Sequence, residues 1–121
     1  MDERRALDCL AALSQQTRLN AFRLLVAHEP EGMAAGEIAR LASVPQNTMS
    51  AHLATLSDCG LAMSQRHSRS IVYWADLETF NALLLFLLQD CCGGRPEICA
   101  PILAQIAPCC RPAPKLKETS S

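Results

Sequence analysis

The sequence has few aromatic residues, almost no net charge and no long hydrophobic run. Aromatic residues make up 4% of the 121 residues, and 11 Lys and Arg against 12 Asp and Glu leave a net charge of −1 at pH 7. Such a chain cannot bind nucleic acid through a uniformly basic surface, so any contact of this kind must come from a local basic patch. The longest uninterrupted apolar run, residues 82–88, is far shorter than the roughly 20 residues that span a bilayer. A membrane-spanning helix is therefore excluded.

The N-terminal residues 1–5 (MDERR) are charged, and no apolar segment of a secretory signal follows them. We therefore expect a cytoplasmic protein, in which cysteines remain thiols. The chain has seven cysteines, an odd number that cannot all pair within one chain. Five of them lie close to the C-terminus: Cys91, Cys92, Cys99, Cys109 and Cys110. Half of all residues are hydrophobic, which suits one compact domain followed by a thiol-rich segment.

Apolar residues at helical spacing predict three helices in the first part of the chain. Ala6, Leu10 and Leu13 lie on one face of the first helix. Ser14 is the expected N-cap of the second helix, which ends where Pro and Gly appear. A short third helix is expected over residues 35–42.

The fourth predicted helix, which begins near residue 46, has a single narrow apolar stripe. Its large apolar residues are Met49, Leu53 and Leu56, at i, i+4 and i+7. The other side chains are small or polar and are expected to face outward: Gln46, Asn47, Thr48, Ser50, Ala51 and His52. In the major groove of DNA, Asn and Gln pair with adenine, whereas Ser and Thr bond to a base or a phosphate. For His52, a DNA contact and a role in helix packing are equally favoured.

Two β-prone runs, residues 61–65 and 71–75, flank a polar and basic segment at residues 66–70. This pattern predicts a β-hairpin with Arg66 and Arg69 at its tip, where both can reach phosphate or the minor groove. A short helix, a turn, a helix with a polar outer face and a basic hairpin follow one another as in a winged helix-turn-helix. The predicted fold is therefore mainly α with a small β-hairpin, in the order α-α-α-α-β-β-α.

The last predicted helix starts after Asp76, ends near residue 90 and is apolar over more than one face. Its stripe consists of Phe80, Leu83, Leu84, Leu87 and Leu88, and Leu85 and Phe86 widen it. A helix that is apolar over two faces must bury both of them. We expect the second face to meet a copy of itself across a two-fold axis, which predicts a homodimer.

Four motifs together resemble the arsenic-repressor (ArsR) family of metal-sensing transcriptional repressors. They are LSQQTRL at residues 13–19, GEIA at 36–39, QNTMSAHL at 46–53 and CGL at 59–61. The resemblance covers residues 5–92. It implies a homodimer, operator DNA bound by the fourth helix and the wing, and release of the DNA when a metal or metalloid binds.

The chain departs from the family at two known metal positions. The third helix has no cysteine, and residues 77–88 of the last helix contain no His and only Glu78 as an acid. The remaining candidate ligands are Cys91, Cys92 and Cys99, with Cys109 and Cys110 less favoured. Three thiolates suit pyramidal As(III) or Sb(III), and such a set resembles C-terminal arsenite sites of some family members. Cys9 is interpreted as a packing residue, and Cys59, just before Gly60, as a helix-end contact.

These observations predict three segments: a DNA-binding and dimerisation domain at residues 1–92, a cysteine-rich sensing segment at 93–110 and a disordered tail at 111–121. The predicted function is a homodimeric repressor that binds double-stranded operator DNA and releases it when trivalent arsenic or antimony binds C-terminal thiolates. The sequence does not distinguish among arsenite, antimonite, a methylated arsenical and Cd(II) as the natural inducer. Two alternatives remain, a thiol redox switch acting on the same DNA and a thiol metal carrier that does not bind DNA. No arrangement typical of an enzyme stands out.

Overall fold

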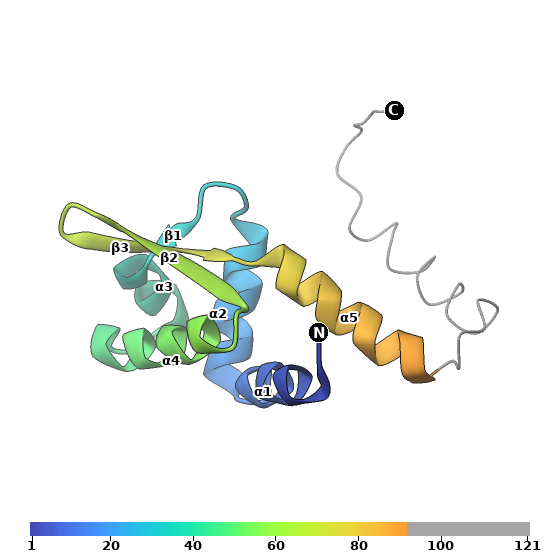
Figure 1. Cartoon of the computed structure of the whole chain (residues 1–121). Helices are drawn as coiled ribbons and strands as arrows, with labels where there is room; N and C mark the ends of the chain where they lie inside the picture. The colour runs from blue at the N-terminus through green and yellow to red at the C-terminus, as the bar shows by residue number, and fades with distance from the viewer. Residues whose placement is uncertain (92–121) are drawn as a thin grey trace. The chain divides into compact units, whose positions relative to one another are not determined.

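The computed structural model describes residues 1–91, and within them side chains up to residue 88; five helices and a three-stranded sheet form this part (Figure 1). The elements are α1 (Glu3–Leu13), α2 (Gln16–Ala27), β1 (Met33–Ala34), α3 (Ala35–Ala42), α4 (Gln46–Asp58), β2 (Ala62–His67), β3 (Ser70–Ala75) and α5 (Leu77–Cys91). The predicted winged helix-turn-helix is confirmed, with β1 as an additional strand. The predicted segments 93–110 and 111–121 lie outside the described residues. Nothing in the described part is a helix long and apolar enough to cross a membrane.

The first two helices begin at side-chain caps. Asp2 Oδ1 accepts a hydrogen bond from Arg5 N at 2.8 Å at the start of α1. The predicted cap of α2 is wrong by one residue, because Ser14 ends α1 and its hydroxyl donates to Ala11 O at 2.8 Å. Gln15 caps α2 instead, and its Oε1 accepts from Arg18 N at 2.9 Å. The Gln15 side chain thus satisfies a free backbone amide in the first turn of α2, as a Ser cap would have done.

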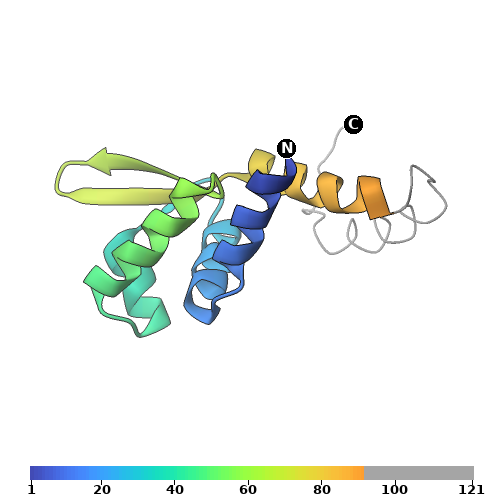
Figure 2. The ribbon, with the colours of Figure 1, turned by 60° about the horizontal axis from the view of Figure 1, so that its bottom comes forward.

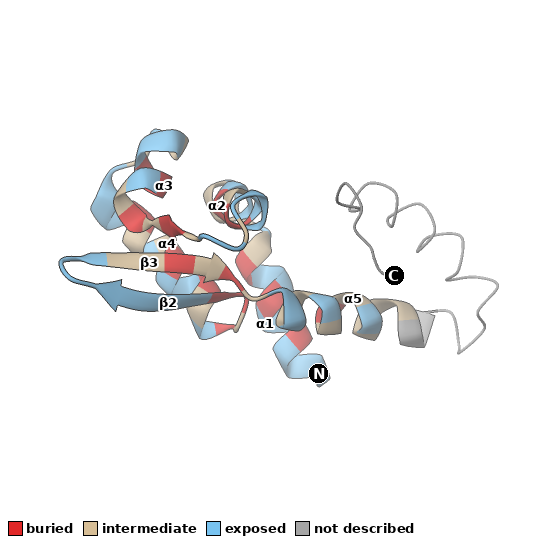
Figure 3. Ribbon diagram, turned by 90° about the horizontal axis from the view of Figure 1, so that it is seen from above, coloured by how far each residue is buried: buried red, intermediate tan, exposed pale blue. Residues whose placement is uncertain are grey.

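The core lies between α1, α2, α3, α4, the first part of α5 and the sheet (Figure 3). Its fully buried large side chains are Leu25, Ile38, Met49, Leu53, Leu56, Leu61 and Leu83. On α1 the buried face consists of Ala6, Cys9 and Ala12, whereas Leu10 is 39% exposed. The buried face of α1 is therefore rotated from the predicted one, since small side chains let this helix approach its neighbours closely.

The sheet has the order β1-β3-β2, with all neighbouring strands antiparallel. The β2–β3 hairpin is the predicted wing, but its strands reach further than expected, because Arg66 pairs with Ile71 and His67 with Ser70. The turn is thus reduced to Ser68, which has φ 59°, and Arg69. The polar residues at 66, 67 and 70 are therefore exposed residues of the two strands and do not belong to a wider turn.

The final helix α5 starts as predicted after Asp76, whose Oδ1 accepts from Thr79 N at 3.2 Å. Its apolar residues are not all covered: Leu83 is 2% exposed, whereas Leu85 is 51% exposed and Leu77 43%. Within the compact unit of residues 1–86, a strip of apolar surface therefore remains open on α5.

Candidate DNA-binding surface and thiol positions

A tight turn joins α3 to α4. Ser43, after the end of α3, has φ 57°, in the left-handed region, and its amide and that of Val44 donate back to Arg40 O and Ala39 O. Pro45 then precedes α4, and Met49 N donates to Pro45 O at 2.9 Å. A left-handed residue followed by a proline reverses the chain within three residues, which produces the two crossed helices of a helix-turn-helix.

The faces of α4 agree with the sequence prediction. Met49, Leu53 and Leu56 are completely buried. Of the predicted DNA-binding residues, Gln46, Asn47, Thr48, Arg66 and Arg69 are exposed, and Ser50 and His52 are half-buried. Three buried side chains therefore pack α4 against the core, and the first turn of the helix is exposed to solvent.

The first turns of α4 and the tip of the wing meet at one groove. Gln46 and Ser50 of α4 line it together with Arg69 at the hairpin turn and with residues 34–36 at the start of α3. The Gln46 side chain lies over Gly36, where an added Cβ would stand 3.3 Å from Gln46 Oε1. Figure 2 shows the β2–β3 hairpin extending beside α3 and α4. Two parts of the predicted interface, separated by 19 residues of sequence or more, are therefore brought together.

Asn47 and Arg66 take other positions. Asn47 Oδ1 accepts a hydrogen bond from Thr48 N at 2.9 Å, which holds this side chain at the first turn of α4. Arg66 projects from β2, three residues from the hairpin turn residue Arg69. Both remain on the exposed surface, but they do not line the groove.

His52 contacts another helix. Its Nδ1 lies 3.2 Å from Arg18 Nη1 of α2, and Arg18 Nε donates to Ala12 O of α1 at 2.7 Å. Of the two interpretations of His52, this contact favours helix packing. Sequence reasoning missed Arg18, because a contact across 34 positions leaves no local pattern.

Charge on this surface is concentrated on the wing. On α3, Arg40 Nε donates to Glu37 Oε1 at 3.1 Å, and this hydrogen-bonded pair lowers the pKa of Glu37 and raises that of Arg40. Neither Arg66 nor Arg69 forms an ion pair within the described residues. The wing therefore carries two uncompensated positive charges, the local basic patch that a chain of net charge −1 requires.

The predicted metalloid ligands fall at or beyond the end of the described chain. Cys91 is the last residue of α5, and Cys92, Cys99, Cys109 and Cys110 lie outside the described residues. Among the residues that are described, no three His, Cys, Asp or Glu side chains lie close enough together to hold a metal ion. The C-terminal thiol site stays a prediction.

The other two cysteines form a buried pair. Cys9 and Cys59 are 0% and 8% exposed, and the Cys9 thiol donates to Cys59 O with an Sγ–O distance of 3.4 Å. Burial, and then the neighbouring Cys59, raise the pKa of Cys9 to about 11. The predictions that Cys9 packs in the core and that Cys59 makes a contact at a helix end are confirmed, but no sequence pattern indicates that the two pack against each other.

Comparison with known proteins identifies relatives of this fold. Residues 13–65 match the helix-turn-helix domain family. The chain is 34% identical over 83 residues to the HTH-type transcriptional regulator YgaV of Escherichia coli (strain K12), and the match covers 69% of this chain and 82% of YgaV. An ArsR-like transcriptional regulator from Rhodococcus sp. RHA1 superimposes with a TM-score of 0.62 at 25% identity, over 85% of this chain and 92% of that one.

A third relative is similar in fold. It is the solution structure of a homodimeric winged helix-turn-helix DNA-binding domain, Mb0332 from Mycobacterium bovis. It superimposes with a TM-score of 0.57 at 22% identity and covers 83% of this chain and 93% of its own. Both structural matches cover a larger share of the chain than the helix-turn-helix alone.

Proposed function

The chain belongs to the ArsR family of winged-helix transcriptional regulators, and on this basis we propose that it is a cytoplasmic repressor that releases operator DNA when trivalent arsenic or antimony binds C-terminal thiolates. The observation that carries the DNA-binding part is the groove shared by Gln46, Ser50 and Arg69. It joins amide and hydroxyl groups suited to base edges with a guanidinium suited to phosphate. No catalytic role is proposed.

The repressor acts as a homodimer. Four large apolar side chains of α1 and α5 are exposed to solvent: Leu7, Leu10, Leu77 and Leu85. A second copy would remove this apolar surface from water, and the similar Mycobacterium bovis domain is homodimeric. Two α4 helices related by a two-fold axis would then read half-sites about one helical turn apart.

The metalloid ligands we propose are Cys91, Cys92 and Cys99, with Cys109 and Cys110 as the alternative source of the third thiolate. Cys91, the last residue of α5, Cys92, the next residue in the sequence, and a third thiol seven residues later would supply the three sulfur donors of pyramidal As(III) or Sb(III). Gly93 and Gly94 favour a chain reversal just after the pair. Since α5 would also carry part of the dimer contact, ligation at its end can alter the spacing of the two α4 helices.

A titration of labelled duplex DNA tests this proposal. The reduced protein is added to DNA from upstream of its own gene, and fluorescence anisotropy is followed as arsenite, antimonite, a methylated arsenical, Cd(II) or hydrogen peroxide is added. We expect tight binding and release by arsenite and antimonite. A Gln46→Ala/Asn47→Ala double variant lacks two side chains proposed to contact bases, so it should no longer prefer this DNA over unrelated DNA. Equal binding to unrelated DNA would contradict operator-specific binding. Release of the Cys9→Ala variant by peroxide, but not by arsenite or antimonite, would favour a redox switch at the C-terminal cysteines.

The source of the third thiolate can be separated in the same assay. Closing a loop of seven residues from Cys92 to Cys99 is favoured over seventeen residues to Cys109 by only about 0.8 kcal/mol, which leaves the choice to experiment. Truncation after Ala107 should preserve release and the arsenic stoichiometry, whereas Cys99→Ser should lose both. The opposite result would assign the ligand to Cys109 or Cys110.

A further inference from the structure

Cys9 and Cys59 lie where α1 contacts the C-terminal end of α4, the helix that we propose reads DNA. Cys59 follows the last residue of α4, and its carbonyl oxygen accepts hydrogen bonds from the Cys9 thiol at 3.4 Å and from Arg5 Nε at 3.3 Å. The Cys59 thiol in turn donates to Leu56 O at 3.3 Å. Both cysteines are free thiols, and the proximity of Cys59 contributes to the raised pKa of Cys9. Two thiols separated by 50 positions are thus placed side by side inside the domain.

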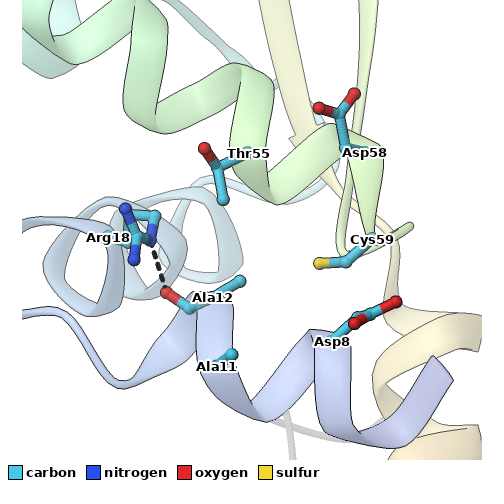
Figure 4. A pocket seen from close by; sticks show the side chains of 7 residues that line it. All are labelled: Asp8, Ala11, Ala12, Arg18, Thr55, Asp58 and Cys59. Carbon is cyan, nitrogen blue, oxygen red and sulfur yellow. Dashed lines mark hydrogen bonds between the residues drawn. The ribbon is translucent and has the colours of Figure 1, made fainter. Parts of the chain in front are cut away.

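A pocket of about 280 Å³ opens beside this pair (Figure 4). Its walls are formed by Asp8, Ala11, Ala12, Arg18, Thr55, Asp58 and Cys59. The Cys59 sulfur points into the space between α1 and α4, whereas Cys9 is not part of the lining. A small molecule entering the pocket therefore reaches Cys59 first.

The charges around the pocket select the kind of reagent. Two carboxylates, of Asp8 and Asp58, and one guanidinium, of Arg18, line the pocket, and this net negative lining disfavours anionic oxidants. Hydrogen peroxide is neutral and close to water in size, so neither charge nor size hinders its entry into a pocket of about 280 Å³. Cys9, with a pKa of about 11, stays protonated near neutral pH, so direct attack of Cys9 on peroxide is disfavoured.

We propose that Cys9 and Cys59 are a second thiol site, which a small neutral peroxide converts into an intrachain disulfide. The Cys59 thiol attacks one peroxide oxygen, which breaks the O–O bond and gives a sulfenic acid and, from hydrogen peroxide, one water. The Cys9 sulfur then attacks the Cys59 sulfur, forming the S–S bond and releasing the sulfenic oxygen as a second water. Two thiols are oxidised by two electrons and one peroxide is reduced.

The disulfide would act on the DNA-binding surface. It removes both thiol hydrogen bonds at the end of α4 and fixes α1 to Cys59, two residues before the buried Leu61 and three before β2. The end of α4 and the start of the wing must adjust to this link, so DNA affinity should fall. This consequence, unlike the disulfide itself, rests on the proposed function.

Mass spectrometry of the full chain tests the chemical step. The five C-terminal cysteines are replaced by Ser, the protein is treated with hydrogen peroxide and quenched, and peptides and free thiols are measured after unfolding. We expect a linked Cys9–Cys59 peptide, no remaining free thiol, and recovery of both thiols with dithiothreitol. Two free thiols, or a sulfinic acid at Cys59 without a link, would overturn the inference.

Single variants test the order of the two steps. In the same background Cys9→Ala should accumulate a sulfenic acid at Cys59 that dimedone traps, whereas Cys59→Ala should leave Cys9 unreacted. Rapid oxidation of Cys9 in the Cys59→Ala variant would contradict the proposed entry through the pocket. If either variant fails to fold, the linked peptide of the unaltered pair still decides the inference.

Binding to the upstream DNA tests the coupling. The oxidised form should bind at least fivefold more weakly than the reduced form, the lower end of common allosteric effects. Equal affinities would overturn the coupling. Failure of the reduced form to bind counts instead against the proposed function.

Discussion

Arg18 Nη1 lies 3.2 Å from His52 Nδ1, and this contact links α2 to the recognition helix α4. Because Arg18 Nε also donates to Ala12 O at 2.7 Å, one guanidinium connects α1, α2 and α4. A guanidinium only donates, so His52 must present Nδ1 as an acceptor. We infer that His52 positions α4, and that its effect on DNA binding depends on Arg18.

A double-mutant cycle tests this dependence. His52→Ala and Arg18→Ala should each weaken operator binding by about three- to tenfold, because a hydrogen bond of this kind contributes about 1 kcal/mol. The double variant should bind the operator no more weakly than the single variant with the lower affinity, since both substitutions remove the same Arg18–His52 contact. Additive effects in anisotropy titrations would show that His52 touches DNA by itself.

The wing arginines should bind DNA phosphates. Replacing Arg66 and Arg69 together by Ala should weaken binding to all DNA sequences and flatten the plot of log affinity against log salt by about one unit for each phosphate that is no longer bound. Arg4→Ala is the matched control, because this exposed arginine lies on α1 outside the wing. An unchanged salt slope in the double variant would exclude the wing as a phosphate clamp.

Gly32 should not accept a side chain. Its φ is +77°, and an added Cβ would stand 2.8 Å from Tyr73 O and 2.6 Å from Trp74 Nε1, which donates to Pro30 O. Gly32→Ala should lower the free energy of unfolding by about 1–3 kcal/mol and shift the fluorescence of Trp74, the sole tryptophan, to longer wavelength.

A second glycine provides the control for this change. Gly36 lies in α3, where an added Cβ would be 3.3 Å from Gln46 Oε1 at the end of a flexible side chain. Gly36→Ala should leave stability unchanged or slightly raised, as Ala favours helix over Gly. Equal stability of the two variants in urea unfolding would contradict the strain assigned to Gly32.

The raised pKa of Cys9 predicts loss of stability at alkaline pH. The unfolded chain releases this proton near the ordinary pKa of 9.0, whereas the folded protein keeps it until about 11. Above pH 9 the unfolded state therefore binds fewer protons than the native state, and the free energy of unfolding falls as pH rises between 9 and 11. The fall should be about 2 kcal/mol.

Comparison with Cys9→Ala isolates this effect from other alkaline titrations. Urea unfolding of both proteins is measured at about pH 8 and about pH 10.5, on either side of the onset of thiol ionisation. The stability difference between the proteins should shrink at the higher pH. A constant difference would mean that Cys9 ionises equally in the folded and unfolded chains.

Much of the candidate DNA-binding surface can be predicted from the sequence, because neighbouring residues of α4 determine which of its faces is buried. Three apolar residues at i, i+4 and i+7 predict which face is buried, and Met49, Leu53 and Leu56 are indeed fully buried. The same pattern places the polar residues around them outside. The wing is predictable for the same reason, as alternation and a turn are local signals.

Other features depend on contacts that no local pattern records. The strand β1 has only two residues, Met33 and Ala34, and exists because they pair with Tyr73 and Val72 of β3. The Cys9–Cys59 pair likewise requires the approach of α1 to the end of α4. Periodicity places a residue on a face, but it does not identify the partner of that face.

Release of DNA by arsenite from thiol variants tests the central claim that DNA binding and metalloid sensing use separate residues. Operator affinity and arsenite-induced release are measured for the reduced wild type, Cys91→Ser and Cys92→Ser, with Cys9→Ala as a thiol control outside the proposed site. We predict that all four proteins bind the operator alike, and that only the wild type and Cys9→Ala release it. Release of Cys91→Ser or Cys92→Ser at the arsenite concentration that frees the wild type would contradict the claim.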